Sequence, residues 1–307
     1  MIEQFLPGMP GLTVKDGKDF IDTKSTDFEN EVLKFYEDYI SSTEDKTSHL
    51  SSRFALTSDS AKGFFAFIKH MKSLSKLPVA VKGQITGPVT FGLSVTDENQ
   101  KSIIYNDQLK DVAVKLIAMK AKWQARQLSV FDCPVIIFLD EPAFASFGSS
   151  PFVSISREEG VRYIEKTIRA IHSENGLAGI HICANADWSL ALSSSADIVN
   201  FDAYSFFDKF ILYPKHIKKF IESGRCLAFG SIPTSQAEDI EKATTSLLAM
   251  DLKEKISQIE KIGIDRAKIL EQSFITPSCG TGTLSFAHAK KVLALTKEVS
   301  KIFQKDI

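Results

Sequence analysis

The stretch CPVIIFLDEP, residues 133–142, is the part of the sequence that best indicates the fold. Its β-branched run and its closing proline are typical of a short buried strand. A long helix is predicted before it, because apolar residues recur at spacings of three and four from Leu109 to Met119, and another helix is predicted near residues 157–173. A strand between two helices indicates parallel β/α units.

The same alternation extends in both directions from this stretch. Helices are predicted near residues 59–74, 206–222 and 285–304, with two more before the last strand. The other five apolar strand candidates are PVAVKGQ (78–84), LAGIHICA (177–184), ADIVNFDAY (196–204), RCLAFGSIP (225–233) and QSFITPSCG (272–280). The pattern fits a (β/α)8 barrel or an open doubly wound sheet.

The N-terminal segment follows a different pattern. GLTVKDGKDFID (11–22) predicts two short strands around Asp16-Gly17, and a helix is expected from Phe28 to Ile40. Only six of the eight strands of a complete barrel are visible. We therefore predict an α/β protein with one domain over residues 1–307, a TIM-barrel-like fold that lacks its first β/α units and carries an N-terminal β-hairpin.

The composition excludes several classes of protein. Lys and Arg total 37 against 38 Asp and Glu, and no basic stripe stands out, so a nucleic-acid partner is not expected. No apolar run approaches the about 20 residues of a membrane-spanning helix, and the first residues do not resemble a signal peptide. Four cysteines in 307 residues do not form a disulfide framework. We expect a cytoplasmic protein, and the sequence is compatible with a homo-oligomer.

Polar side chains that can take part in catalysis or in ligand binding stand at the ends of the predicted strands, and this favours the barrel. In a barrel the carboxyl ends of all strands converge on one mouth, whereas an open sheet spreads them apart. The residues at these ends include Gln84, Asp140, His181, Cys183, Asp202, Ser231 and Cys279.

His181 and Cys183 are two positions apart on one strand, so their side chains share a face. Such a pair is more often structural than metal-binding, and this spacing leaves both interpretations open. If the barrel closes, Asp202 and Cys279 reach the same mouth. An imidazole, two thiolates and a carboxylate then suit Zn²⁺.

Five segments carry a resemblance to a known family: KGQITGPVTFG (82–92), FLDEPAF (138–144), HICANADW (181–188), DIVNFDAY (197–204) and ITPSCGTGTL (275–284). In order and approximate spacing they resemble the catalytic barrel of cobalamin-independent methionine synthase and its shorter single-barrel relatives. The resemblance covers nearly the whole chain from about residue 5, and its most specific parts are HIC and TPSCG.

The resemblance implies a zinc centre that activates a substrate thiol. The matching ligand positions are His181, Cys183, Cys279 and Asp202, where Asp202 replaces the family's usual glutamate. Asp140 would bind the amino group of an amino-acid thiol such as homocysteine and is the expected catalytic residue. Gln84 and Ser231, also at strand ends, are predicted to contact the substrate.

Two departures from the family pattern shape the expected reaction. The segment CLAFGSIPTS (226–235) lacks the histidine of folate-using members, so we expect a methyl-corrinoid donor, delivered by a corrinoid protein. The family's first strand, with its Gly-Ser motif, does not appear before residue 3. Two alternatives stay open: an enzyme like uroporphyrinogen decarboxylase that acts on a tetrapyrrole, and a non-catalytic truncated barrel that serves as a binding subunit.

Overall fold

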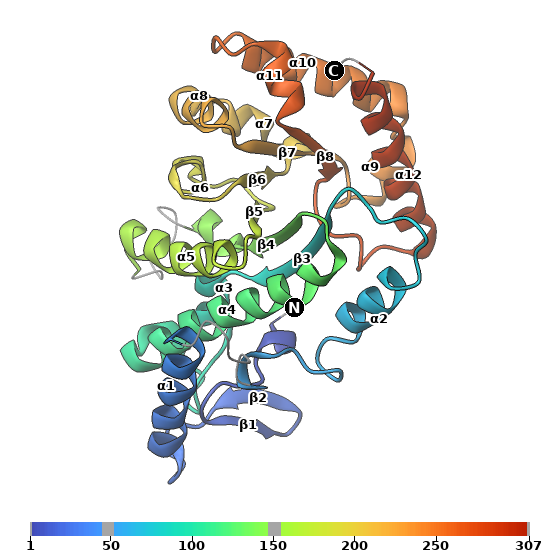
Figure 1. Cartoon of the computed structure of the whole chain (residues 1–307). Helices are drawn as coiled ribbons and strands as arrows, with labels where there is room; N and C mark the ends of the chain where they lie inside the picture. Colours follow the sequence, from blue (N-terminus) through green and yellow to red (C-terminus); the bar gives the residue numbers. More distant parts are fainter. Residues whose placement is uncertain (1, 45–51, 147–154, 306–307) are drawn as a thin grey trace. The chain divides into compact units, whose positions relative to one another are not determined.

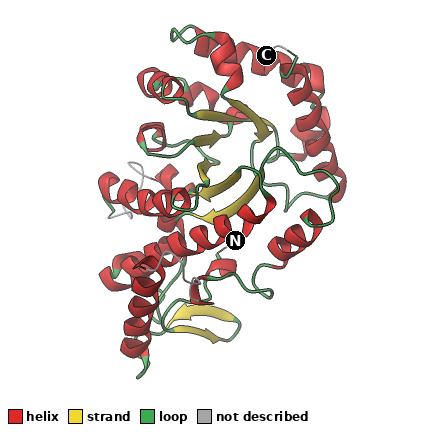
Figure 2. Ribbon diagram, viewed as in Figure 1, coloured by secondary structure: helices red, strands yellow, loops and turns green. Residues whose placement is uncertain are grey.

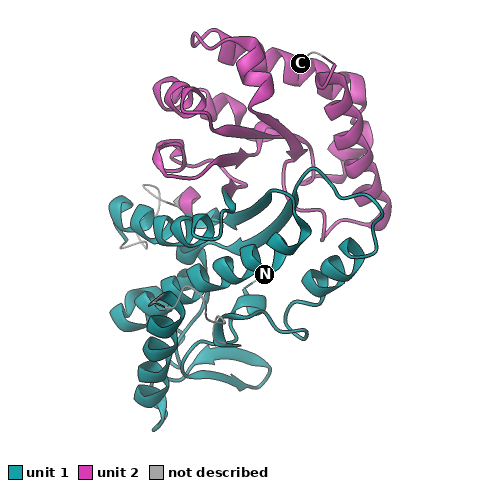
Figure 3. Ribbon diagram, viewed as in Figure 1, with its two compact units in different colours: residues 1–143, 150–178 teal, residues 144–149, 179–307 magenta. Residues whose placement is uncertain are grey.

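A computed structural model describes residues 2–44, 52–146 and 155–305 of the chain (Figure 1). The chain forms two compact units, which Figure 3 colours separately. Unit 1 comprises residues 1–143 and 150–178, and unit 2 comprises residues 144–149 and 179–307. Apolar side chains are buried in both units, so each unit has a hydrophobic core of its own.

Unit 1 begins with the predicted β-hairpin. Strands β1 (Leu12–Lys15) and β2 (Lys18–Ile21) pair in antiparallel register. Asp16 and Gly17 between them have φ values of +52° and +73°. Two successive positive φ values are typical of the tight turns whose twist matches that of the paired strands. The Asp-Gly signal therefore predicted the hairpin correctly.

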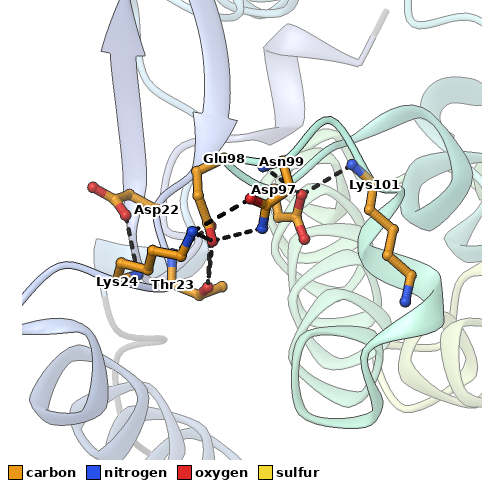
Figure 4. Close-up of polar contacts among 7 residues, drawn as sticks. All are labelled: Asp22, Thr23, Lys24, Asp97, Glu98, Asn99 and Lys101. Atoms are coloured by element: carbon orange, nitrogen blue, oxygen red, sulfur yellow. Dashed lines mark hydrogen bonds and ion pairs between the residues drawn. The ribbon is translucent and has the colours of Figure 1, made fainter.

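A polar cluster holds the segment that follows the hairpin (Figure 4). The Glu98 carboxylate accepts hydrogen bonds from the Thr23 backbone N–H at 3.1 Å and from the Thr23 hydroxyl at 3.0 Å, and it pairs with Lys24 at 3.4 Å. Burial raises the pKa of Glu98, but the Thr23 hydrogen bonds outweigh it and bring the pKa to about 2. Asp97 accepts from the Asn99 N–H at 2.8 Å and closes the adjoining turn.

The parallel strands of unit 1 are β3 (Val81–Thr86) and β4 (Val135–Asp140), paired from Val81 opposite Val135 to Thr86 opposite Asp140. Between them runs the long helix α4 (Asp107–Leu128), whose N-terminus is capped by the Asn106 side chain. The other α-helices described in this unit are α1 (Phe28–Glu44), α2 (Lys62–Met71), α3 (Pro88–Ser94) and α5 (Arg157–His172).

Unit 2 holds strands in the order β5-β6-β7-β8, each parallel to its neighbour. β5 spans Leu177–Ile182, with its first two residues in unit 1, and is followed by β6 (Ile198–Phe201), β7 (Cys226–Ile232) and β8 (Ser273–Pro277). The helices are α6 (Trp188–Ser193), α7 (Ala203–Phe210), α8 (Pro214–Glu222), α9 (Ala237–Lys242), α10 (Thr245–Glu260), α11 (Arg266–Glu271) and α12 (Phe286–Phe303).

Aromatic packing joins the strands of unit 2 to their helices. Phe201 of β6 stacks on Phe210 of α7 with ring centroids 3.8 Å apart, and Trp188 of α6 meets both rings edge-on. All three side chains are fully buried. The face of β6 opposite to Asn200 therefore belongs to the core, and alternation along the strand leaves Asn200 on the other face.

The structure confirms the α/β class, six strands with parallel pairing that alternate with helices, and the N-terminal hairpin (Figure 2). Two helix predictions were wrong in detail. The helix expected at 206–222 is two helices, because α8 starts anew at Pro214, a residue suited to a first helical turn. Three helices, not two, lie between β7 and β8, since Thr244 and Asp265 each cap a new helix.

Short 3₁₀ helices complete the described elements: Glu3–Phe5, Ser52–Phe54, Ile103–Tyr105, Ser129–Phe131 and Pro142–Ser146. Over residues 2–44, 52–146 and 155–305, no helix is both long and apolar enough to cross a bilayer.

Candidate metal centre

His181 and Cys183 lie at the carboxyl end of β5 in unit 2. Ile180 and Ile182, which alternate with them, are fully buried, whereas His181 and Cys183 are only half-buried. Alternation along the strand therefore directs both ligand-type side chains away from the core face.

Cys279 joins this pair from the loop that follows β8. The imidazole nitrogen and the two sulfurs of His181, Cys183 and Cys279 all lie within 4.8 Å of one another. Among the described residues, this is the one group of three or more His, Cys, Asp or Glu side chains that meets this spacing. Two thiols and an imidazole this close together form a donor set that soft or borderline metal ions prefer.

The surroundings of Cys279 favour its thiolate. Hydrogen bonds from the Cys183 and His181 side chains lower the pKa of the Cys279 thiol to about 4, against the opposing effect of burial. The backbone N–H of Gly280 and the positive charge of His181 act in the same direction. Because a thiolate is the form that ligates metals, Cys279 is prepared for coordination at neutral pH.

Asn200 of β6 fixes the orientation of His181. The Asn200 amide nitrogen donates to the Ala228 carbonyl at 2.8 Å and to the Thr276 hydroxyl at 3.0 Å, so its oxygen is directed to the third partner, His181 Nδ1. An amide oxygen can only accept, and Nδ1 must therefore carry a proton. The other ring nitrogen, Nε2, is then the one that would bind a metal, in place of the proton that it holds toward Cys279.

Sequence reasoning missed Asn200 as a functional residue. The available signal was a polar side chain inside the apolar strand IVNF, two positions before Asp202. Asn200 is 7% exposed, and a buried amide requires hydrogen-bond partners. Which partners it finds depends on β7 and β8, and these cannot be identified from the strand alone.

Asp202 lies outside the group of three. Its carboxylate Oδ1 accepts a hydrogen bond from the Ser205 N–H at 2.9 Å and caps the N-terminus of α7. Its side chain is nearly buried. The structure thus gives Asp202 a helix-capping role, which uses one of its two oxygens.

Ser231, a predicted substrate contact, is fully buried in β7. Its hydroxyl has no hydrogen-bond partner among the described residues. Near the same strand end, the hydroxyls of Thr234 and Ser278 are hydrogen-bonded to each other at 2.8 Å, and both residues are buried. None of these three hydroxyls is open to solvent.

Asp140 and Gln84 belong to unit 1. Asp140 is the last residue of β4, and Gln84 lies two residues before the end of β3. The Gln84 amide nitrogen donates a hydrogen bond to the Asp140 carboxylate. In the parallel register Gln84 lies opposite Phe138, two residues before Asp140, so both side chains are on the same face of the paired strands. The two predicted substrate contacts of this unit are therefore close to each other.

Glu141, next to Asp140, is a completely buried acid. It accepts hydrogen bonds from the backbone N–H groups of Val89 at 3.1 Å and Thr90 at 2.7 Å, and from the Thr90 hydroxyl. Burial raises the pKa of Glu141 to about 7 despite these bonds. A Cβ on Gly87 would lie 2.1 Å from Glu141 Oε2, so the TGP segment needs glycine at this position.

Comparisons with known proteins support the fold and go no further. No protein-family profile matches the sequence, and no curated protein does so. Among 29 matching chains of solved structures is a Listeria monocytogenes protein provisionally assigned as a vitamin-B12-independent methionine synthase, with 16% identity and a TM-score of 0.53, over 80% of this chain and 69% of that one. A dihydropteroate synthase from Clostridium difficile, solved with pteroic acid, has 12% identity and a TM-score of 0.27 over 89% of both chains.

Proposed function

We propose that this protein is a zinc-dependent methyltransferase that moves a methyl group to a thiol. The observation that carries the proposal is the group formed by His181, Cys183 and Cys279, whose ligand atoms lie within 4.8 Å of one another. These are the residues that match the zinc-ligand motifs of the methionine synthase family. The fold similarity to a methionine-synthase-like structure supports the same class of enzyme.

The three residues fit a zinc ion by the chemistry of their donors. His181 would bind through Nε2, because Asn200 occupies Nδ1, and Cys183 and Cys279 would bind as thiolates. A zinc ion with three protein ligands keeps a position open for a further donor. Zinc bound there would hold a substrate thiol in its deprotonated, nucleophilic form.

The family resemblance offers Asp202 as a fourth protein ligand. Because its Oδ1 caps α7, a role as ligand would fall to Oδ2. We propose that Asp202 would be a fourth ligand only before the substrate binds, since the substrate sulfur needs a position of its own on the metal.

We propose a homocysteine-like acceptor and a methyl-corrinoid donor delivered by a corrinoid protein. The reaction forms a sulfur–carbon bond on the thiol and breaks the cobalt–carbon bond of the donor, whose electron pair stays with cobalt. The thiol proton is released to solvent. Cobalt leaves without needing a proton, which fits a chain that lacks the family's proton-donating histidine.

Asp140 is the proposed contact for the amino group of the acceptor, and its bond from Gln84 holds the carboxylate in one orientation. We leave Ser231 out of the proposed site because its hydroxyl is fully buried. None of the four cysteines is in a disulfide, and we propose that the enzyme acts in the reducing cytoplasm.

Metal analysis and a methyl-transfer assay test the proposal together. We expect about one zinc per chain and methylation of homocysteine by methylcobalamin, with both lost in Cys279→Ser. Cys133→Ser and Cys226→Ser are matched controls, because neither residue belongs to the group, and both should keep metal and activity. A metal-free protein that is fully active, or a Cys279→Ser variant with full zinc content, would contradict the proposal.

A further inference from the structure

Unit 1 contains a pocket of about 330 Å³ that is separate in its residues from the candidate metal centre. This volume lies in the range of small-molecule sites. The lining residues come from the N-terminal segment, α2, β3 and α4: Gln4, Phe5, Phe64, Phe67, Lys82, Gly83, Gln84 and Gln124.

The pocket runs along the open edge of β3. Three consecutive residues of this strand line it, although neighbours on a strand point to opposite faces. The Val81 N–H bonds to Pro134 and the Gly87 N–H bonds to Asp140, so the odd-numbered residues face β4. The backbone N–H and C=O groups of Lys82 and Gln84 therefore point away from β4, toward the pocket.

Gln124 provides an independent sign of a missing ligand. Its side chain is 1% exposed and lines the pocket, and its amide nitrogen has no hydrogen-bond partner among the described residues. A buried donor without a partner is costly and uncommon. An acceptor group on a ligand in the pocket would satisfy it.

The lining residues define the chemistry of that ligand. They include one cation, Lys82, whose Nζ lies 4.8 Å from the centroid of the Phe138 ring. The lining itself holds no carboxylate; burial lowers the pKa of Lys82, and the nearby Asp140 carboxylate opposes this effect. The unpartnered amide nitrogen of Gln124 can donate to an anion, and along the edge of β3 single N–H groups can do so between the C=O groups of the same residues. Phe5, Phe64 and Phe67 provide an apolar aromatic wall, which suits a flat hydrophobic group.

We propose that unit 1 binds a small flat carboxylate in this pocket, with the carboxylate toward Lys82 and Gln124 and the apolar body against Phe64 and Phe67. The pocket shares no residue with the candidate metal centre, and through Gln84 it adjoins Asp140, the proposed contact for the acceptor amino group. The ligand is an aromatic monocarboxylate.

Calorimetric titration of the full chain with 2-naphthoate tests the proposal. We expect saturable binding of one molecule per chain, and 2-naphthamide, which has the same shape without the charge, should bind about tenfold more weakly or worse. Lys82→Met should weaken the binding of 2-naphthoate to a similar extent, and Gln124→Met should weaken it by about fivefold. Lys69→Met, on an exposed position of α2 outside the lining, is the matched control and should bind as the wild type does.

Tryptophan fluorescence locates the binding. Trp123 packs against Phe64 with ring centroids 5.5 Å apart, so 2-naphthoate in the pocket should quench its emission, and Trp123→Phe should lose that signal but keep the calorimetric heat. Chelator treatment and Cys279→Ser should leave the binding unchanged, which distinguishes this site from the metal centre.

Three results would overturn the proposal: no binding up to about 2 mM 2-naphthoate, equal binding of the neutral amide, or loss of binding with Cys279→Ser. The comparison of the two probes uses the wild-type chain and stays decisive if Lys82→Met fails to fold, which circular dichroism would reveal.

Discussion

Replacing Asn200 should weaken metal binding without touching a metal ligand. Asn200 accepts the Nδ1 proton of His181 and donates to Ala228 and Thr276. Asn200→Leu keeps the approximate size but removes the acceptor, so His181 loses the contact that holds a proton on Nδ1 and directs Nε2 to the metal position. Loss of a hydrogen-bond partner of a metal-ligating side chain typically weakens metal binding by about 10–100-fold, which corresponds to about 1.4–2.7 kcal/mol.

Asn200→Asp tests the contact with His181 separately from the contact with Ala228. The carboxylate still accepts a hydrogen bond from the Nδ1–H of His181, but it cannot donate one to the Ala228 carbonyl. Both variants should lose stability, by about 1–3 kcal/mol, because each leaves a buried acceptor without its donor. Only Asn200→Leu should show the about 10–100-fold loss of metal affinity.

Competition titrations of Zn²⁺ and Co²⁺ against a chromophoric chelator measure these affinities without any enzymatic assay. Urea unfolding of the metal-free variants gives the matching stabilities. The reasoning is refuted if Asn200→Leu binds zinc as tightly as the wild type, or if Asn200→Asp is weakened as much as Asn200→Leu.

Four further predictions concern the two units separately. Cys279→Ser should reduce zinc content to near zero in elemental analysis, whereas Cys226→Ser should retain it. Burial raises the pKa of Glu141 in the folded state to about 7, so its contribution to stability is complete below about pH 4.5 and is lost as the pH rises through 7. Urea unfolding should show the unfolding free energy falling by up to about 3 kcal/mol between pH 5 and 8, and this fall should be smaller in Glu141→Gln. Gly87→Ala should lower the unfolding free energy by about 1–3 kcal/mol, since its Cβ would collide with Glu141, and an unchanged denaturation midpoint would contradict this. Asp140→Asn should raise KM for homocysteine more than for an acceptor thiol without an amino group, and equal effects on both acceptors would argue against an amino-group contact.

Local patterns in the sequence were sufficient to predict the elements of this protein. Alternation and helical periodicity depend on neighbouring residues, and they identified the strands around residues 133–142 and 177–184 and the hairpin at Asp16-Gly17. The same local geometry places His181 and Cys183 on one face of β5, because residues two apart on a strand always share a face.

The composition of the site depended on contacts between distant segments. Family resemblance suggested Cys279 as a partner of His181, but their closeness depends on how β5 and β8 are placed within unit 2. Tertiary structure alone revealed that Asn200 bonds His181 and that Asp202 caps a helix. A sequence pattern records which side chains share a face of one element, whereas hydrogen bonding and metal ligation require atoms from different elements to meet, and only packing determines that.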